Sequence, residues 1–471
     1  MIPATGDWRA LERAMDGAVV RPDSPGYDEV RKPAMLRFHD IRPVAIAMCA
    51  TPDDVSATIA FARRNALEIA IRSGGHSVAG RSSTRGLLVD VTPMNAVSVE
   101  RGVVAVGAGT RLGALEDVLL PHGLTIPVGS SRSVGVAGLT LGGGIGILGR
   151  THGLTCDQLL RATVVLADGR VTECDETSDA DLFWALRGAG GGTFGVVTSF
   201  VFRSVPLPET AVFHVSWPFE HASGLMGAWQ AWAPDGPDEL EATLRLSVGG
   251  DGDRQPVVDL FGAMLGTDAD PEVLIDEMTA DVGARPAAST FLQVPYRDAK
   301  RYLDGLTPHE MWHDGAVPNR PSRAGELFTR SEFFRRTIPS KTISALSESF
   351  LRDVRSGESR EVTFTPWAGA YNRVPADATA FVHRDARFIV QHLTSVVPEA
   401  DPSVRASGRR WLERSWGVVH PWGTGGVYPN FPDPELDDPG HAYHGANYER
   451  LLRVRDMYDP DGTFRFPQSL V

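Results

Sequence analysis

Cysteine is scarce in this sequence, and its pattern excludes two kinds of fold. The three residues, Cys49, Cys156 and Cys174, contain no C-x-x-C pair and leave one thiol over. A disulfide framework and a zinc site are therefore not expected, and we predict no bound metal. Such cysteine usage fits a reducing compartment.

Runs of basic residues and long apolar runs are missing as well. The net charge is −13, and Lys and Arg are interspersed with acidic residues, which argues against nucleic acid and anionic membranes as partners. The most apolar stretch, residues 134–149, is too short and too rich in glycine to cross a membrane. Asp7 and Trp8 stand where a signal peptide would carry basic residues and then an apolar core. We expect a cytoplasmic protein, whose oligomeric state the sequence leaves open.

Glycine, by contrast, is abundant, with 49 residues that concentrate before residue 200. Many tight turns, or close contacts between backbone and a ligand, explain such an excess. The length of 471 residues exceeds what a single core supports, so we expect two or three domains.

The pattern of strands and helices changes at V-P-L-P-E, residues 205–209. Before it, a strand at 44–49 leads to Thr51 and Pro52, which read as a helix N-cap and the first helical residue. After it, strand-like and helix-like runs alternate, which predicts an antiparallel sheet covered by helices. The expected strands are 212–217, 243–248 and 257–265, and the expected helices are 272–282, 340–352 and, near the C-terminus, 448–458.

Two glycine-rich stretches are candidates for ligand binding. I-R-S-G-G-H-S-V-A-G at 71–80 reads as a strand that ends in a ligand-facing turn, where Arg72 suits a phosphate and His76 offers a nucleophilic imidazole. Taken alone, the motif favours an ordinary strand-turn-strand loop with a capping histidine. Residues 129–149 hold so much glycine that we expect no helix interior there. Matches to G-x-G-x-x-G at Gly144 and Gly190 lack the strand-to-helix context of a dinucleotide site.

Six motifs in this order resemble the berberine-bridge-enzyme-like branch of the FAD-linked oxidases, which have the vanillyl-alcohol-oxidase fold with a PCMH-type FAD-binding domain. The resemblance covers nearly the whole chain. The motifs are R-S-G-G-H-S-V-A-G at 72–80, V-G-V-A-G-L-T-L-G-G-G-I-G-I-L-G-R at 134–150, F-G-V-V-T at 194–198, S-E-F-F-R-R at 331–336, F-V-H-R at 381–384 and Y-H-G-A-N-Y-E-R-L at 443–451.

This resemblance implies an α+β protein in three parts. Residues 1–210 would form an FAD-binding domain of two α/β subdomains, with its PCMH-type core at about 37–207. Residues 211–424 would form a substrate domain, an antiparallel sheet backed by helices. Residues 425–471 would return to the FAD domain as a C-terminal segment.

The resemblance also implies how FAD is bound. In the family the histidine of G-G-H bonds covalently to the flavin 8α-methyl group, and that residue here is His76. Backbone N–H groups of the two glycine-rich loops would hold the pyrophosphate and ribityl chain, Gly195 would lie near the adenine, and Asn447 would approach the flavin ring. The implied contacts are Arg72, Ser73, Gly74, Gly75, His76, Ser77, Gly80, Ser131, Val134, Gly135, Gly138, Gly142, Gly144, Gly146, Gly195, Val197 and Asn447.

One departure from the family pattern concerns a second covalent bond. Many members attach the flavin through a cysteine in G-x-C-x-x-V-G-V, where this chain reads G-S-S-R-S-V-G-V with Ser131 at the cysteine position. We therefore predict a single covalent link, through His76, and a lower flavin potential. Val134 occupies the position at which members with valine admit oxygen.

Two residues are candidates for the catalytic base. Tyr428, in V-Y-P-N-F, matches the base of sugar-oxidising relatives, but a tyrosine ionises near pH 10 unless a cation lowers its pKa. His392, in F-I-V-Q-H-L, falls on a strand that faces the flavin in relatives, and imidazole titrates close to neutrality. An error of one residue in the register would exchange His392 with Gln391.

The sequence thus predicts an FAD-dependent oxidase. It would transfer a hydride from a small alcohol, sugar, amine or natural-product intermediate to covalently bound flavin, with O2 as acceptor and H2O2 as product. A flavin dehydrogenase with another acceptor is the nearest alternative. A nicotinamide-dependent reductase and a non-enzymatic flavin-binding protein are further alternatives, and the substrate itself cannot be read from the sequence.

Overall fold

The N-terminal part of the computed structural model begins with a four-stranded sheet. The structure describes residues 7–249, 255–266, 269–280, 282–306 and 325–470. Strands β2 (Ala45–Met48), β4 (Leu87–Asp90) and β3 (Ile69–Arg72) run parallel, and β1 (Ala18–Val20) adds an antiparallel edge. Helix α3 (Pro52–Arg64) connects β2 to β3 and begins with the predicted cap, since the Thr51 hydroxyl accepts a hydrogen bond from the Asp54 N–H.

A second sheet of five antiparallel strands follows in the same domain. Its order is β5-β6-β10-β8-β9. The domain also holds short helices α1 (Trp8–Arg13), α2 (Tyr27–Val30) and α6 (Gly149–His152). The remaining bounds are β5 Val97–Glu100, β6 Val103–Gly107, β8 Leu159–Val165, β9 Val171–Cys174, β10 Val196–Arg203, α4 Leu112–Leu119, α5 Val136–Leu141 and α7 Ala180–Leu186.

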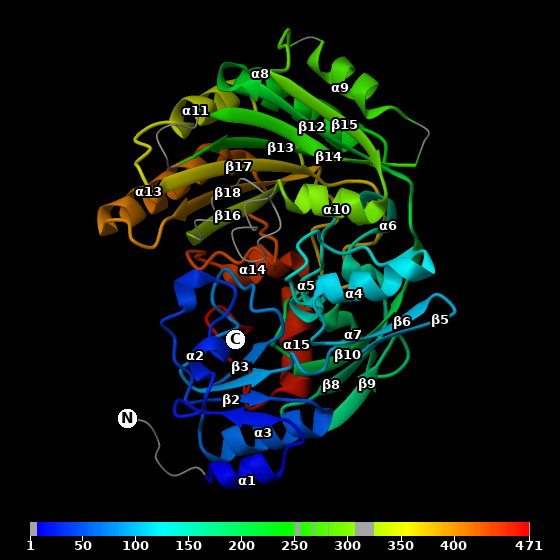
Figure 1. The fold of residues 1–471 in the computed structure, drawn as a ribbon, viewed down its shortest axis with the longest axis vertical. Coiled ribbons are helices and arrows are strands. Elements are labelled where there is room, and N and C mark those ends of the chain that lie inside the picture. The colour runs from blue at the N-terminus through cyan, green and yellow to red at the C-terminus, as the bar shows by residue number, and fades with distance from the viewer. Residues whose placement is uncertain (1–6, 250–254, 267–268, 281, 307–324, 471) are drawn as a thin grey trace.

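The chain then builds a seven-stranded antiparallel sheet in the order β15-β12-β14-β13-β17-β18-β16, above the first domain in Figure 1. Helices α8, α11 and α13 cover one face, where the large apolar side chains of the strands pack. Helix α10 lies on the other face, toward the first domain. The bounds are β12 Thr210–Pro218, β13 Leu240–Val248, β14 Val257–Leu265, β15 Ala288–Val294, β16 Glu326–Phe334, β17 Glu358–Pro366, β18 Phe388–Val396, α8 Ala222–Trp232, α9 Pro271–Thr279, α10 Tyr296–Asp304, α11 Ser340–Phe350, α12 Ala370–Arg373 and α13 Pro402–Val419.

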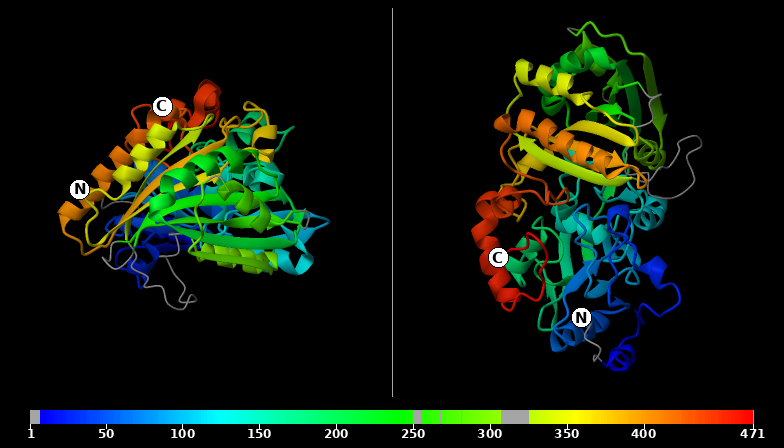
Figure 2. Two further views of the ribbon diagram at one scale, coloured as in Figure 1. Left: turned by 90° about the horizontal axis from the view of Figure 1, so that it is seen from above. Right: turned by 90° about the vertical axis from the view of Figure 1, so that its left-hand side faces the viewer.

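The C-terminal tail returns to the first domain, as Figure 2 shows in red. Its helices are α14 (Pro439–His444) and α15 (Tyr448–Tyr458), and α15 packs beside α7. Leu451, Val454 and Phe464 are buried in the core of the first domain. A tail more than 200 residues distant in sequence therefore completes that core.

These elements confirm the α+β prediction, the antiparallel sheet covered by helices, and most of the predicted strands and helices. The expectation of no helix interior within 129–149 is wrong, because α5 is helical through Gly138. Buried Val136, Thr140 and Leu141 on this short helix supply the packing that offsets the cost of the glycine. In the part of the chain that the structure describes, no helix has both the length and the apolar character needed to cross a membrane.

Candidate active site

The loop after β3 lies directly against the loop before α5. An added Cβ on Gly74 would overlap the backbone nitrogen of Gly135, and one on Gly135 would overlap the nitrogen of Gly74. His76 and Ser131, both half-buried, lie on these two loops. The two segments predicted to hold the cofactor are therefore adjacent in space, and glycine is what allows their backbones to meet.

One of the predicted glycines leaves open backbone. Gly138 is exposed, and no atom lies within 4 Å of a Cβ added there. Gly75, by contrast, is buried beside Pro33 and Ala34, and its φ of +75° is a conformation that favours glycine. Bare backbone such as that at Gly138 can approach a phosphate closely and donate its N–H groups to it.

Other predicted glycines face protein atoms instead. A Cβ at Gly142 would overlap the Asn430 side chain, one at Gly144 would overlap Thr155, and one at Gly146 would overlap the Val128 carbonyl. In the same way Gly80 lies against the ring of Phe38, and Gly195 and Val197 are buried beside Val164 in the five-stranded sheet. Packing between segments of the chain therefore accounts for the small residues at these positions, and their contact with the cofactor stays a prediction.

Two polar side chains that were predicted to contact the cofactor, Arg72 and Ser73, bind carbonyl groups of the chain instead. Arg72 is buried, and its guanidinium donates to the carbonyls of Ser82, Val30 and Arg31 at 3.1, 2.7 and 2.7 Å, so it does not project toward a phosphate site. Ser73 donates to the Ala108 carbonyl.

Asn447 likewise ties two segments of the chain together. Its amide nitrogen donates to the carbonyls of Ala376 and Thr379 at 2.7 and 3.1 Å. Both amide hydrogens are therefore used in holding the tail to the loop before β18. The carbonyl oxygen of this side chain is left for other contacts, and its predicted approach to a flavin ring stays a prediction.

Tyr428 lies against the glycine-rich segment. Its phenol oxygen accepts hydrogen bonds from the Gly144 N–H at 2.9 Å and from the Asn430 amide at 3.1 Å. Burial raises the pKa of Tyr428 well above its usual value of 10, and these donors act in the opposite direction by stabilising the phenolate. Asn430 also donates to the Leu139 carbonyl, so the Y-x-N motif links the tail to α5.

His392 lies on the helix-covered side of the sheet. It is 0% exposed, and its Nδ1 is 2.8 Å from the hydroxyl of Ser415 on α13. Burial lowers the pKa of His392 to about 3, and the nearby Arg330 charge acts in the same direction. The prediction that His392 faces a flavin is therefore wrong. Its neighbour Gln391 points to the opposite side of the sheet, toward the first domain.

The side of the sheet that faces the first domain is polar near β18. Gln391 is half-buried, and its amide donates to the Thr329 hydroxyl at 3.0 Å. On either side of it along β18, Ile389 packs with Tyr428 and Leu393 packs with Met35. The sequence offered Gln391 only as the residue that a register shift of one would exchange with His392.

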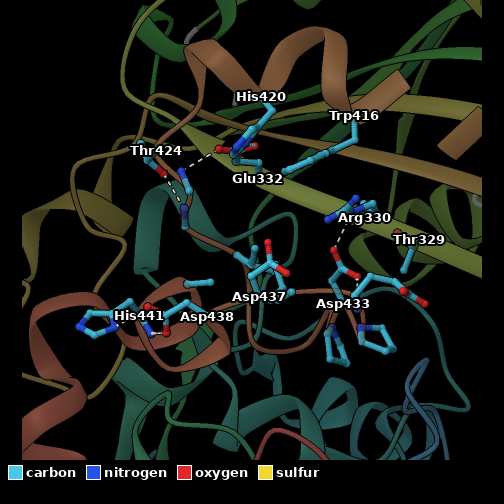
Figure 3. A pocket seen from close by; sticks show the side chains of 18 of the residues that line it. Thr329, Arg330, Glu332, Trp416, His420, Thr424, Asp433, Asp437, Asp438 and His441 are labelled. Atoms are coloured by element: carbon cyan, nitrogen blue, oxygen red, sulfur yellow. Dashed lines mark hydrogen bonds and ion pairs between the residues drawn. The ribbon is translucent and has the colours of Figure 1, made fainter. Parts of the chain in front are cut away.

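A cleft of about 970 Å³ opens at the edge strand β16, between α13 and the tail (Figure 3). Arg330 pairs with Asp433 at 2.7 Å and lies 3.8 Å from the ring of Trp416. Glu332 accepts from the Gly425 N–H at 2.7 Å and lies 2.9 Å from His420. The contacts of Arg330 with Asp433 and of Glu332 with Gly425 join β16 to the tail.

The three cysteines lie apart from the Ser131 loop, in β9, in the turn after α6 and at the end of β2. All three are buried, and burial raises the pKa of Cys49 and of Cys174 to about 12. None has the exposed, thiolate-favouring surroundings of a reactive cysteine. Among the residues that the structure describes, no group of three His, Cys, Asp or Glu side chains is arranged to hold a metal ion.

Comparisons with known proteins agree with this architecture. The chain matches a family of FAD binding domains at residues 43–175 and the berberine and berberine-like family at 427–470. An uncharacterised FAD-linked oxidoreductase of Bacillus subtilis (strain 168), YvdP, is 32% identical, over 97% of this chain and 98% of its own length. The chain belongs to the berberine-bridge-enzyme-like family of FAD-linked oxidoreductases.

Relatives of known activity are found at lower identity. The chitooligosaccharide oxidase of Gibberella zeae (strain PH-1) is 29% identical, over 91% of this chain and 87% of its own length. A structure of the glucooligosaccharide oxidase of Acremonium strictum, described as carrying a 6-S-cysteinyl, 8α-N1-histidyl FAD, superposes with a TM-score of 0.85 at 26% identity, covering 98% of both chains.

The residues of this berberine-bridge-enzyme-like chain fit FAD in two respects. Open backbone at Gly138 suits a pyrophosphate, and the loop that carries His76 touches the loop that carries Ser131. These two loops are segments that would hold the cofactor.

Proposed function

We propose that this chain is an oxidase in which FAD is attached by one covalent bond, to His76. The observation that carries the proposal is the pair of touching loops that holds His76 and Ser131. The glucooligosaccharide oxidase structure is described as carrying a cysteinyl and a histidyl linkage, and the motif resemblance matches His76 to the histidyl position and Ser131 to the cysteinyl one. The buried positions of Cys49, Cys156 and Cys174 support a single link, since none lies on either loop.

The flavin, when bound, accepts a hydride from a C–H bond of a small organic substrate. We propose Tyr428 rather than His392 as the group that takes the proton from the neighbouring O–H or N–H. Two N–H donors point at the Tyr428 oxygen and would stabilise its phenolate, whereas His392 is buried behind the sheet. Removal of a general base typically costs 10²–10⁴ in rate.

Molecular oxygen is the proposed acceptor, with H2O2 as product. The half-buried Val134 on the Ser131 loop and the oxidase activity named for two relatives support this choice. A dehydrogenase that reduces another acceptor is the second candidate, because the same loops would serve either reaction.

The covalent bond is tested by precipitating purified protein in acid and measuring flavin fluorescence on the denatured chain. We expect fluorescence in the wild type and in the Cys49→Ser/Cys156→Ser/Cys174→Ser variant, and none in His76→Ala. Loss of all flavin from the wild type would refute the His76 link. Flavin absorbance that stays with the denatured His76→Ala chain would refute the single linkage.

The base and the acceptor need kinetic tests. In anaerobic stopped flow, Tyr428→Phe should slow flavin reduction by at least about 10²-fold, and His392→Asn should change it less than about threefold. Oxygen consumption compared with reduction of a dye then separates oxidase from dehydrogenase. A Tyr428→Phe variant that reduces its flavin at the wild-type rate would contradict the assignment.

A further inference from the structure

Gln468, in the C-terminal tail, joins segments of the chain that are far apart in sequence. Its side-chain oxygen accepts hydrogen bonds from Arg81 Nη2 at 3.2 Å and from the Tyr443 hydroxyl at 3.1 Å. Its side-chain nitrogen donates to the Asp433 carbonyl at 2.8 Å. One amide side chain therefore connects the loop that carries His76 to two earlier parts of the tail.

The backbone of Gln468 adopts an unfavourable conformation. Its φ is +67°, in the left-handed region that residues other than glycine rarely occupy. Such a conformation persists only where the surrounding contacts determine it, and it is found most often at functional positions. The three hydrogen bonds of the Gln468 amide are contacts of that kind, and they explain why a glutamine rather than a glycine stands at this position.

On the first domain the connection ends at the turn that directly follows His76. The Gly80 N–H donates to the Ser77 carbonyl at 3.0 Å, and the Arg81 N–H donates to the Ser77 hydroxyl at 3.1 Å. The Arg81 guanidinium carbon lies 4.9 Å from the centre of the Phe466 ring, which also belongs to the tail. The tail therefore holds Arg81 by a hydrogen bond and a cation–π contact, and Arg81 in turn closes the turn beside His76.

On the seven-stranded sheet the connection ends at the edge strand β16 (Figure 3). Asp433 is 2% exposed, and its carboxylate accepts a hydrogen bond from Arg330 Nε at 2.7 Å. The Asp433 N–H donates to the Tyr443 hydroxyl at 2.9 Å, so this residue bonds to β16 through its side chain and to the tail through its backbone. The Arg330 guanidinium carbon lies 3.8 Å from the centre of the Trp416 ring on α13, and this contact orients it.

We infer that Gln468 is a positioning residue, which makes the turn beside His76 depend on how the tail is seated on β16. Buried polar groups that bond to one another rigidify the segments that they join. The connection from Arg330 to Arg81 does so between the seven-stranded sheet and the loop. The imidazole that the proposed function assigns to the flavin is thus placed by a side chain of the tail. This inference rests on the proposed attachment of FAD to His76.

Hydrogen–deuterium exchange of the purified holoenzyme tests the turn directly. In Gln468→Met, which has a similar volume but no amide group, the backbone N–H groups of residues 77–81 should exchange at least tenfold faster than in the wild type. In Gln468→Glu, which keeps an oxygen for Arg81 and Tyr443, the increase should be less than threefold. Arg330→Met, at the far end of the connection, should raise exchange at 77–81 by at least threefold.

The second measurement is the fraction of the chain that retains flavin after denaturation in acid. It should fall at least threefold in Gln468→Met and in Arg330→Met. The double variant should fall no further than the larger single loss, because both changes break the same connection. Arg409→Met/Glu435→Gln is the matched control, since it removes an exposed ion pair between α13 and the tail, and it should change neither measurement.

Three outcomes would overturn the inference. They are wild-type exchange at residues 77–81 in Gln468→Met, an additive loss of covalent flavin in the double variant, and a loss in the control equal to that in Gln468→Met. If Gln468→Met is isolated unfolded, Arg81→Met takes its place, because it removes the same hydrogen bond from the other side. A wild-type chain that retains no flavin after denaturation would instead refute the attachment to His76, and exchange at 77–81 would then decide the inference by itself.

Discussion

Replacement of His392 by Asn should make the protein less sensitive to acid. In the folded protein burial lowers the pKa of this imidazole to about 3, whereas in the unfolded chain it titrates near its ordinary value of 6.5. Between these two values the unfolded chain therefore binds one proton more than the folded chain, so stability falls as the pH falls through this window. The slope is about 1.4 kcal/mol per pH unit, which gives about 2.7 kcal/mol between about pH 7.5 and pH 4.5.

The assay compares thermal unfolding of the wild type and His392→Asn at both pH values. Asparagine keeps a polar atom near the Ser415 hydroxyl, so the variant should fold. The difference in Tm between the two proteins should move by about 3 °C in favour of the variant on going to the lower pH, because the entropy of unfolding of a chain this long is about 1 kcal/mol/K. His383 and His444 are also buried with lowered pKa values, but they are common to both proteins and cancel in the comparison. A difference in Tm that is equal at both pH values would refute the placement of His392 as a buried neutral imidazole.

Further substitutions test the packing of the site. Gly74→Ala should lower covalent flavin incorporation and destabilise the fold by about 1–3 kcal/mol, because its Cβ would overlap the Gly135 backbone. The control Gly227→Ala, in α8 with nothing within 4 Å of its added Cβ, should be neutral or stabilising in the same melting assay. Asn447→Ala should cost about 1–3 kcal/mol in urea unfolding and leave the flavin absorption spectrum unchanged, since its amide binds carbonyls at 376 and 379. A shifted flavin spectrum in Asn447→Ala would contradict that reading.

Local signals in the sequence predicted much of the fold. The Thr51–Pro52 cap placed the start of α3. The strand-like run at 257–265 matches β14 to the residue, and the amphipathic run at 448–458 matches α15. The change of pattern at residues 205–209 falls where the seven-stranded sheet begins. Such features depend on neighbours in sequence, so they are visible without a structure.

The orientation of site residues could not be predicted in the same way. In β18 eight of the nine residues are buried, so no alternation in hydrophobicity distinguishes the face of His392 from that of Gln391. Arg72 carries the charge of a phosphate ligand, but its partners are carbonyls about 40 residues earlier and 10 residues later. A glycine-rich sequence likewise does not say whether a missing side chain makes room for a ligand or for another part of the chain.

The distribution of glycines changes how the tail should be understood. At Gly142 and Gly144, the space that a side chain would take belongs to Asn430 and Thr155, and the Gly144 N–H is bonded to Tyr428. The glycine-rich segment is therefore shaped as much by the C-terminal tail as by any cofactor. Because the proposed base comes from that tail, the contact that seats the tail on the FAD domain is also the contact that positions Tyr428 for chemistry. A change that loosens the tail should then lower the rate of flavin reduction even when His76 still holds the flavin.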